Sequence, residues 1–297
     1  MQPHLSTQVM ILTPRESLIQ ALQRAKPEGL PPHLELEFQL SAITPGIEQK
    51  ALYAANLEGV TGSRRQDLLK RNAEMWVKVA ERFDWSCITG LHWLNLEDQA
   101  QSFGYVRELA GDTYMLSAFI DGTYGIPSGQ DMVEHVIWLT EHEEEALQQA
   151  QERVDSEVAR GRELIQAGAE IIFMCADYCF NDGPFLSPRM FAKYVTPFLT
   201  QQVRSLQEAG AFVVKHTDGD IMPIIDQLVA SGADALHSLD PMAGVDIAEV
   251  KRRYGDRLAL IGNVNCAWVQ AGTREQIERS ARYCLKHGGV SSGGYVY

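Results

Sequence analysis

Three stretches of the sequence place a glycine at the end of a predicted helix and an apolar strand a few residues later. They are Gln166-Ala-Gly-Ala-Glu-Ile-Ile, Glu208-Ala-Gly-Ala-Phe-Val-Val and Ser231-Gly-Ala-Asp-Ala-Leu. Glycine readily adopts the left-handed conformation that ends a helix and turns the chain back. Helices that alternate with strands through such short turns predict a parallel sheet with helical crossovers.

The number of predicted strands favours a barrel over an open sheet. Candidate strands lie at 34–39, 85–91, 114–120, 171–176, 211–217, 234–238, 258–262 and 293–297. Eight such strands favour an α/β fold of the closed (β/α)8 TIM-barrel type, whereas the alternative, a doubly wound open sheet, usually carries a glycine fingerprint that is missing here. With 297 residues, 45% of them hydrophobic, the chain can bury this core as a single domain over 1–297 or as two smaller domains.

Both ends of the sequence modify the predicted barrel. Thr13, Pro14 and Glu16 form a well-marked helix start, with an N-cap, a proline at the first helical position and a capping-box carboxylate. We therefore expect an N-terminal helical segment within 1–30. The sequence stops within the predicted eighth strand, so we expect the final outer helix to be missing.

The charge of the chain argues against several classes of partner. Its formal charge is −13, from 26 basic and 39 acidic side chains without a basic cluster, which argues against nucleic acid and anionic membranes. The sequence has neither an apolar run of the ~20 residues that span a membrane nor a signal peptide, and this favours a cytoplasmic protein. The 5 cysteines are widely spread, so a disulfide scaffold is not expected.

One predicted strand ends in two side chains that can bind a metal ion or a proton. The apolar run Ala211-Phe-Val-Val-Lys-His-Thr-Asp-Gly219 carries His216 and Asp218 at its carboxyl end, just before a glycine turn and a helix. Alternate residues of a strand point to the same side, ~6–7 Å apart along it. The imidazole and the carboxylate can therefore hold one cation or one substrate proton.

Other polar side chains fall at the ends of the other predicted strands, where the active site of a barrel lies. They are His92, Asp121, Asp177, His237 with Asp240, and Asn263 with Asn265. Glu37 lies on the polar face of the first predicted strand, and Asp182 lies in a long loop, 181–191, that can reach the site. Turn capping by the aspartates and core packing of His92 are the alternatives to a functional role. For Cys175 and Cys179, two buried thiols are favoured over a metal-binding pair.

Several short motifs, spread over most of the chain, carry a resemblance to a known family. They are Thr13-Pro-Arg-Glu, Asn181-Asp-Gly-Pro-Phe-Leu-Ser-Pro, His216-Thr-Asp-Gly, Asp234-Ala-Leu-His-Ser-Leu-Asp-Pro, Tyr254-Gly-Asp-Arg-Leu, Gly262-Asn-Val and Gly293-Gly-Tyr. Together they look like the uroporphyrinogen decarboxylase superfamily, which also contains zinc-dependent, corrinoid-linked methyltransferases. The likeness is strongest from about residue 180 onward.

The resemblance implies a (β/α)8 barrel and, in the methyltransferase branch, a zinc site. That site has a His and a Cys two residues apart on the fifth strand, and a further Cys after the eighth. His216 matches the first ligand, and Asp218 stands where the Cys would be. A carboxylate oxygen is a zinc ligand in its own right, at ~2.0–2.2 Å. Cys266 is the nearest substitute for the third ligand, and a buried thiol is the alternative for it.

The decarboxylase branch implies a different site. It works without a metal or cofactor and binds a porphyrinogen with many carboxylates through arginines of an Arg-Gln-Ala-Gly-Arg motif near the amino terminus. This motif is absent, and the first predicted strand carries Glu35 and Glu37 instead. Carboxylates at that place would repel an anionic tetrapyrrole. Asp121 could still act as the lone catalytic aspartate on a smaller substrate.

We therefore expect a metal-dependent, methyltransferase-like enzyme that moves a methyl group between a small methylated substrate or thiol and a corrinoid. The expected roles are zinc binding by His216, Asp218 and Cys266, acid–base support by Asp177, Asp121 and His237, and substrate contact by Glu37, His92, Asp182 and Asn263. The expected partners are a small-molecule substrate and a corrinoid protein, with a homodimer as the assembly. A cofactor-independent decarboxylase and a non-catalytic accessory barrel are the alternatives.

Overall fold

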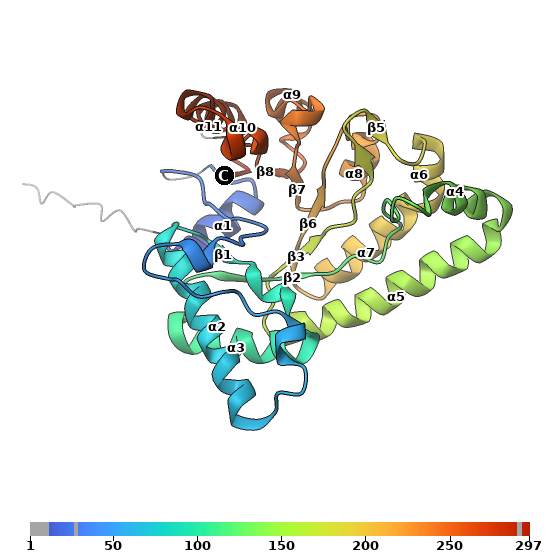
Figure 1. Ribbon diagram of the computed structural model, residues 1–297. Coiled ribbons are helices and arrows are strands. Elements are labelled where there is room, and N and C mark those ends of the chain that lie inside the picture. The colour runs from blue at the N-terminus through green and yellow to red at the C-terminus, as the bar shows by residue number, and fades with distance from the viewer. Residues whose placement is uncertain (1–11, 27–28, 290–292) are drawn as a thin grey trace, which may run out of the picture.

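The computed structural model describes residues 12–26, 29–289 and 293–297, in which helices surround a curled parallel sheet (Figure 1). The sheet contains, in spatial order, β1 (Cys87–Ile88), β2 (Met115–Phe119), β3 (Ile171–Met174), β6 (Phe212–Thr217), β7 (Ala235–Ser238), β8 (Ala259–Ile261) and β9 (Tyr295–Val296). All six neighbouring pairs are parallel. A small antiparallel hairpin of β4 (Cys179–Phe180) and β5 (Gly183–Pro184) lies apart from this sheet.

The helices fill the connections between the strands, as the sequence predicts for an α/β fold. The α-helices are α1 (Pro14–Leu22), α2 (Gly62–Arg82), α3 (Leu96–Ala110), α4 (Met132–Glu141), α5 (Glu143–Ala167), α6 (Pro188–Tyr194), α7 (Thr196–Glu208), α8 (Ile225–Ala230), α9 (Ile247–Tyr254), α10 (Cys266–Ala271) and α11 (Arg274–Gly288). Four short 3₁₀ turns are η1 (Ser41–Ile43), η2 (Ala54–Leu57), η3 (Gly90–Trp93) and η4 (Pro241–Ala243). Among the described residues, no helix combines the length and apolarity that a membrane span needs.

The ring of strands is closed by a short extended segment in place of the first predicted strand. The expected strand at 34–39 is wrong in extent, because only 32–34 pairs with the sheet. Leu34 N–H donates to the Tyr297 carbonyl at 3.2 Å, and Tyr297 N–H donates to the Pro32 carbonyl at 2.8 Å. On the other side, Ser86 N–H donates to the His33 carbonyl at 2.7 Å. This segment therefore joins β9 to β1. Pro32 in this segment and Pro31 before it have no N–H to donate, which limits how far the ladder can extend toward the amino terminus.

The second predicted strand is also shorter than expected. Only Cys87–Ile88 is a strand, and the chain then forms η3, so that His92 lies on a 3₁₀ turn above the strand end. Gly90 passes so close to α2 that an added Cβ would lie 2.0 Å from the ring of Trp76. The close approach of the Gly90 backbone to the Trp76 ring explains why the glycine is needed at the turn.

Alternate strand residues belong to two different apolar cores. Phe173 and Val214 belong to an inner core within the ring, whereas Ile172 and Val213 belong to an outer core between the sheet and the helices. This alternation follows from the two-residue period of a strand. It places the side chain of residue 216 on the inner face and that of residue 215 on the outer face.

Helix α1 fills the end of the inner core at which the strands begin. Its Leu18 and Leu22 are almost fully buried among inner-core side chains of the strands. Arg15 N–H donates to the carbonyl of Thr113, two residues before β2, at 2.9 Å. Side chains at the opposite end of the ring, where the strands finish, are therefore the ones that face an opening.

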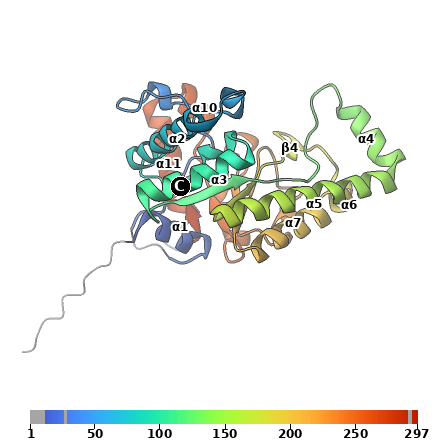
Figure 2. The ribbon, with the colours of Figure 1, turned by 90° about the horizontal axis from the view of Figure 1, so that it is seen from below.

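The α4–α5 pair extends away from the barrel. Figures 1 and 2 show α4 at the far end of the long helix α5, distant from the sheet. Helix α4 leaves Val133 72% exposed and Ile137 47% exposed. The connection from β2 to α5 thus reaches well beyond the ring before the chain returns to β3.

Candidate functional site

The fifth segment of the ring, β6, brings His216 and Asp218 together at the opening. His216 is the second-last residue of the strand, and its side chain is 13% exposed; that of Asp218 is 58% exposed. The Nε2 atom of His216 lies 4.0 Å from an oxygen of Asp218. The two-residue spacing therefore places the imidazole and the carboxylate side by side.

A glycine fixes the turn that follows these two residues. Gly219 has a φ of 83°, in the left-handed region, and an added Cβ would lie 2.5 Å from the carbonyl oxygen of Cys179. Asp220 N–H also donates to the carbonyl of Phe180 at 2.8 Å. The turn after β6 therefore packs directly against the β4–β5 hairpin, which a larger residue at 219 would displace.

Asp177 completes a group of three potential metal ligands. One atom each from Asp177, His216 and Asp218 lie within 4.8 Å of one another. The Asp177 carboxylate is 3.7 Å from Nε2 of His216 and accepts a hydrogen bond from the backbone N–H of Asp218 at 3.1 Å. The hydroxyl of Ser238 donates to the other side of this group, at an oxygen of Asp218. Backbone and side-chain donors thus orient both carboxylates.

A second histidine lies behind the first. His216 and His237 occupy paired positions of β6 and β7, and their Nδ1 atoms lie 2.8 Å apart. One ring therefore donates a proton to the other, while Nε2 of His216 remains directed at the carboxylates. Burial lowers the pKa of His216, against the opposing effect of Asp218 and Asp177. Burial, with a further contribution from His216, lowers the pKa of His237 well below its ordinary value.

The fit of this group to a metal ion follows from its distances and donor types. Ligand bonds of ~2.0–2.2 Å in a tetrahedral site place the ligand atoms ~3.4 Å apart. The distances of 3.7 and 4.0 Å from His216 Nε2 to the two carboxylates are close to that value. One imidazole nitrogen and two carboxylate oxygens therefore fit a divalent cation after small side-chain adjustments.

Asp121 is held by a buried lysine that the sequence analysis did not single out. Lys215 is fully buried, and its Nζ donates to Asp121 at 2.8 Å, to the Ala176 carbonyl at 2.9 Å and to the Met174 carbonyl at 3.2 Å. Burial alone would raise the pKa of Asp121, but the charge and hydrogen bond of Lys215 hold it below its ordinary value. A lysine inside the apolar run of β6 was the available signal, since a buried ammonium needs a partner.

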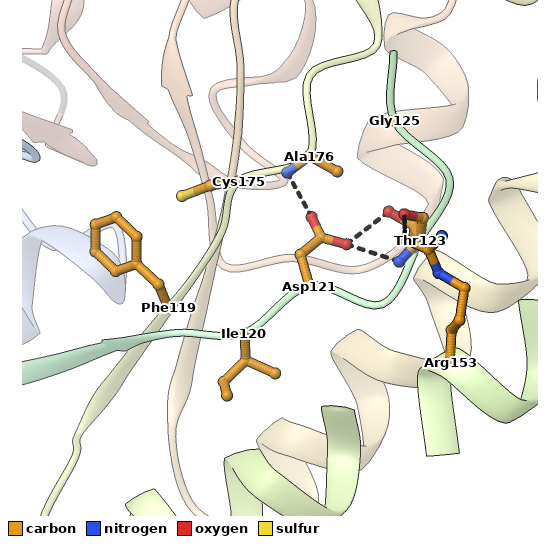
Figure 3. A pocket seen from close by; sticks show the side chains of 8 residues that line it. All are labelled: Phe119, Ile120, Asp121, Thr123, Gly125, Arg153, Cys175 and Ala176. Carbon is orange, nitrogen blue, oxygen red and sulfur yellow. Dashed lines mark hydrogen bonds between the residues drawn. The ribbon is translucent and has the colours of Figure 1, made fainter. Parts of the chain in front are cut away.

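Asp121 also organises the loops around a small cavity. It accepts hydrogen bonds from Thr123 N–H at 3.0 Å, Thr123 Oγ1 at 2.6 Å and Ala176 N–H at 2.8 Å. Figure 3 shows Asp121 between Ala176 and Thr123, with Arg153 beyond Thr123 and the Cys175 sulfur directed toward Phe119. These side chains line a cavity of about 270 Å³. Asp121 therefore reaches the cavity with most of its hydrogen-bonding capacity already used.

The cysteines near the opening are held as thiols. Burial raises the pKa of Cys175 and of Cys179 to about 12. Cys266 is exposed at the start of α10 and lies outside the group of three ligands. Burial first, and then the charges of Asp218, Asp240 and Glu35, raise the pKa of Cys266. Among the described residues, the potential ligand that lies with His216 and Asp218 is thus Asp177, and the role expected of Cys266 stays a prediction.

The four residues expected to contact substrate lie in different environments. Asn263 is buried, and its amide donates to the Leu239 carbonyl at 2.5 Å and accepts from the Cys284 thiol at 3.3 Å, so it is committed to the fold. His92 stacks on Phe119 with ring centroids 3.7 Å apart. Glu37 and Asp182 are exposed, on the 35–40 segment and at the tip of the β4–β5 hairpin.

His92 is a neutral base, and one of its two ring nitrogens is not used in a hydrogen bond within the described residues. Its Nδ1 lies 2.8 Å from the Thr89 carbonyl, which assigns the ring proton to Nδ1. Its Nε2 is buried and has no hydrogen-bond partner within the described residues. Burial lowers the pKa of His92 to about 4. The lone pair of Nε2 is therefore free to accept a hydrogen bond from any group that reaches this buried atom.

Comparison with known proteins relates the chain to one family. A family model described as uroporphyrinogen decarboxylase (URO-D) matches residues 122–297, more than half of the chain. The uroporphyrinogen decarboxylase of Coxiella burnetii (strain Dugway 5J108-111) is 30% identical over 139 residues, covering 43% of this chain and 34% of that protein. That of Pseudoalteromonas translucida (strain TAC 125) is 27% identical over 139 residues, covering 43% and 35%. The match thus spans about a third of the length of these relatives.

A solved structure shares the fold over nearly the whole chain. A methyltransferase from Methanosarcina mazei superposes with a TM-score of 0.71 at 14% identity, covering 96% of this chain and 92% of that one. Identity at this level supports the barrel fold alone.

Proposed function

Because the chain belongs to the uroporphyrinogen decarboxylase family, we propose that it is a metal-dependent, methyltransferase-like enzyme of that family. The observation that carries the proposal is the group of His216, Asp177 and Asp218, whose ligand atoms lie within 4.8 Å at the carboxyl ends of the strands. Active sites of barrel enzymes lie at this end.

The metal ion that we propose is zinc, bound by one nitrogen and two oxygens. His216 would supply Nε2, and Asp177 and Asp218 would each supply one carboxylate oxygen, leaving a further position for substrate. When bound, zinc acts as a Lewis acid that keeps a coordinated sulfur or oxygen nucleophile deprotonated near neutral pH.

The neighbouring residues orient these three ligands. For His216 to bind through the lone pair of Nε2, its proton must be on Nδ1, which then donates to Nδ1 of His237 over 2.8 Å. His237 consequently carries its own proton on Nε2. Ser238 and the backbone of Asp218 hold the two carboxylates through hydrogen bonds. We assign His237 a positioning role, because it bonds to the ring nitrogen of His216 that is not the proposed ligand atom.

The proposed reaction moves a methyl group between a small methylated substrate or thiol and a corrinoid carried by a partner protein. Glu37, Asp182 and the free Nε2 of His92 would contact the substrate. Asp121, paired with Lys215, would set the position of the loop at 121–123 instead of exchanging protons.

Cofactor-independent decarboxylation is the second candidate, since Asp121 lines the cavity and the curated relatives carry the decarboxylase name. The two candidate reactions require different side chains. Decarboxylation requires Asp121 and no metal, whereas methyl transfer requires His216 and Asp218. A non-catalytic accessory barrel would bind a ligand in the cavity without turnover of either kind.

Metal analysis of purified protein tests the proposal. Wild type and Asp182→Asn, which alters an exposed carboxylate outside the group of three, should each retain about one zinc ion per chain after dialysis. His216→Ala and Asp218→Asn should weaken zinc binding by at least about tenfold, because each removes a ligand. A zinc content that His216→Ala leaves unchanged would refute the assignment.

An activity screen then separates the candidate reactions. The zinc-loaded protein would be incubated with free cobalamin and methoxylated aromatics, methylamines or methylated thiols, and methylcobalamin would be followed by absorbance. Turnover that depends on His216 but tolerates Asp121→Asn supports methyl transfer. Turnover of a carboxylated substrate that needs Asp121 and persists in EDTA supports decarboxylation instead.

A further inference from the structure

The loops around the opening have an unusually one-sided charge. They follow the carboxyl ends of the ring segments at 35–49, 89–95, 120–131, 175–187, 218–224, 239–246 and 262–273. None of these seven stretches contains a lysine or an arginine, and together they contain Glu35, Glu37, Glu48, Asp121, Asp177, Asp182, Asp218, Asp220, Asp240 and Asp246, besides Asp131, which lies at the start of α4 and away from the ring. Three basic residues follow these stretches closely in the sequence: Lys50, Arg189 and Arg274. Lys50 comes after the chain has begun to run along α2, where Gln49 bonds to the carbonyl of Arg71, and the other two lie on α6 and α11.

Several of these carboxylates act on common groups at the opening. The charges of Asp218, Asp240 and Glu35 all raise the pKa of the Cys266 thiol, after the larger effect of burial. Because three different loops contribute these charges, their fields add over the opening. Carboxylates that converge on one opening in this way attract cations and repel anions.

Two basic residues lie close to the cavity, and they offset only a small part of the charge of the loops. Lys215 lies below the loops and is paired with Asp121. Arg153 reaches the cavity from α5, where its guanidinium donates to the carbonyls of Gly122 and Thr123 at 3.1 and 3.2 Å. Lys215 is therefore balanced by Asp121, whereas Arg153 bonds to neutral carbonyl oxygens and keeps its positive charge at the α5 side of the cavity; neither cation comes from one of the seven loops.

The cavity also provides a surface on which a cation can pack. Phe119 and Cys175 line it on one side and Asp121 on the other. Aromatic rings attract alkylammonium groups as well as apolar ones. A zinc ion would balance two carboxylates, those of Asp177 and Asp218, and Lys215 balances Asp121, which leaves loop carboxylates such as Glu37 and Asp240 without a cation among the described residues.

We propose that this opening selects positively charged small molecules, such as quaternary or protonated amines, and excludes carboxylate-bearing ones. The inference rests on the proposed function for the location of the site and adds the substrate class. It implies that a porphyrinogen with many carboxylates is a poor ligand for this chain. Methylated amines are the methyl donors that such an opening would concentrate.

Three ligands of the same shape and different charge test the inference directly. Choline, 3,3-dimethylbutan-1-ol and 3,3-dimethylbutanoate all carry the same branched head on a short chain. Their dissociation constants would be measured by protein-observed NMR on the full chain, with and without added zinc, at 20 and 300 mM NaCl. Choline should bind about tenfold more tightly than the alcohol at low salt, and the butanoate most weakly. The preference should shrink at high salt because the opening is exposed to solvent.

Charge variants show whether the loops are the cause. Glu37→Gln combined with Asp240→Asn should reduce the preference for choline over the alcohol by about threefold or more. Glu74→Gln, on the exposed side of α2, is the matched control and should leave the preference unchanged. Equal binding of choline and the alcohol, tighter binding of the butanoate, or no binding of any of them at 10 mM would overturn the inference.

The outcomes separate this inference from the proposed function. Zinc binding with no preference for choline would refute the substrate class alone. A preference for choline in a protein that does not bind zinc would refute the metal site alone.

Discussion

Replacing Lys215 by methionine tests how strongly the buried pair with Asp121 stabilises the fold. Methionine keeps the length of the side chain and removes the ammonium, which has three acceptors at 2.8, 2.9 and 3.2 Å and is fully buried. The Asp121 carboxylate would then remain in the interior without its cation, although Thr123 and Ala176 would still donate three hydrogen bonds to it.

Removing one partner of a buried ion pair costs ~3–5 kcal/mol. Because three hydrogen bonds still stabilise the Asp121 carboxylate, we expect Lys215→Met to lose about 3 kcal/mol of unfolding free energy, at the lower end of that range. The loss should depend on pH. With Lys215 present, the lowered pKa of Asp121 contributes stability above its unfolded-state pKa of ~3.9, and this is lost as pH falls through the folded-state pKa. Without Lys215, burial raises the pKa of Asp121, so the variant regains stability relative to wild type as pH falls.

Urea unfolding followed by the fluorescence of the buried residues Trp76 and Trp85 measures both effects. Wild type, Lys215→Met, Asp121→Asn and the double variant would be compared at pH 7 and pH 5. The double-mutant cycle should give a coupling of ~2 kcal/mol at pH 7 and a smaller value at pH 5. A loss below ~1 kcal/mol for Lys215→Met, or a coupling that does not change with pH, would contradict a charged, buried pair.

Three further changes have clear expected results. Gly219→Ala should lower the unfolding free energy by about 2 kcal/mol, because the added Cβ would lie 2.5 Å from the carbonyl oxygen of Cys179; urea unfolding equal to wild type would count against this. His92→Phe should flatten the loss of stability between pH 6.5 and pH 4, since burial lowers the pKa of His92 to about 4 and the unfolded chain takes up the proton first; unchanged pH–stability curves would disprove it. Ser238→Ala should weaken zinc binding about tenfold in calorimetry by releasing Asp218, and an unaltered affinity would exclude that role for the hydroxyl.

Much of the fold follows from patterns that are local in the sequence. Gly168 and Gly210 end their helices at positive φ, as the repeated turns predict, and strands follow both of them. The bounds of the paired segment at 32–34 could not be predicted from local patterns. Its pairing depends on Tyr297 and Ser86, which approach it only when the ring has closed.

The candidate site likewise contains residues that local sequence predicts and residues whose contacts depend on the whole fold. The spacing of His216 and Asp218 on one strand was enough to predict that they meet, because neighbours on a strand face are fixed by its geometry. The partnership of Lys215 with Asp121 joins positions 94 residues apart, and no local pattern indicates it. Asp177 was recognised as a rim residue, but its approach to His216 depends on the order of β3 and β6 in the sheet.

The position of α1 has a consequence for the traffic of ligands through the protein. With Leu18 and Leu22 filling the foot of the ring, the described residues leave the end at which the strands finish as the route into the barrel. Substrate and product share that route, so a product that stays bound there competes with the next substrate.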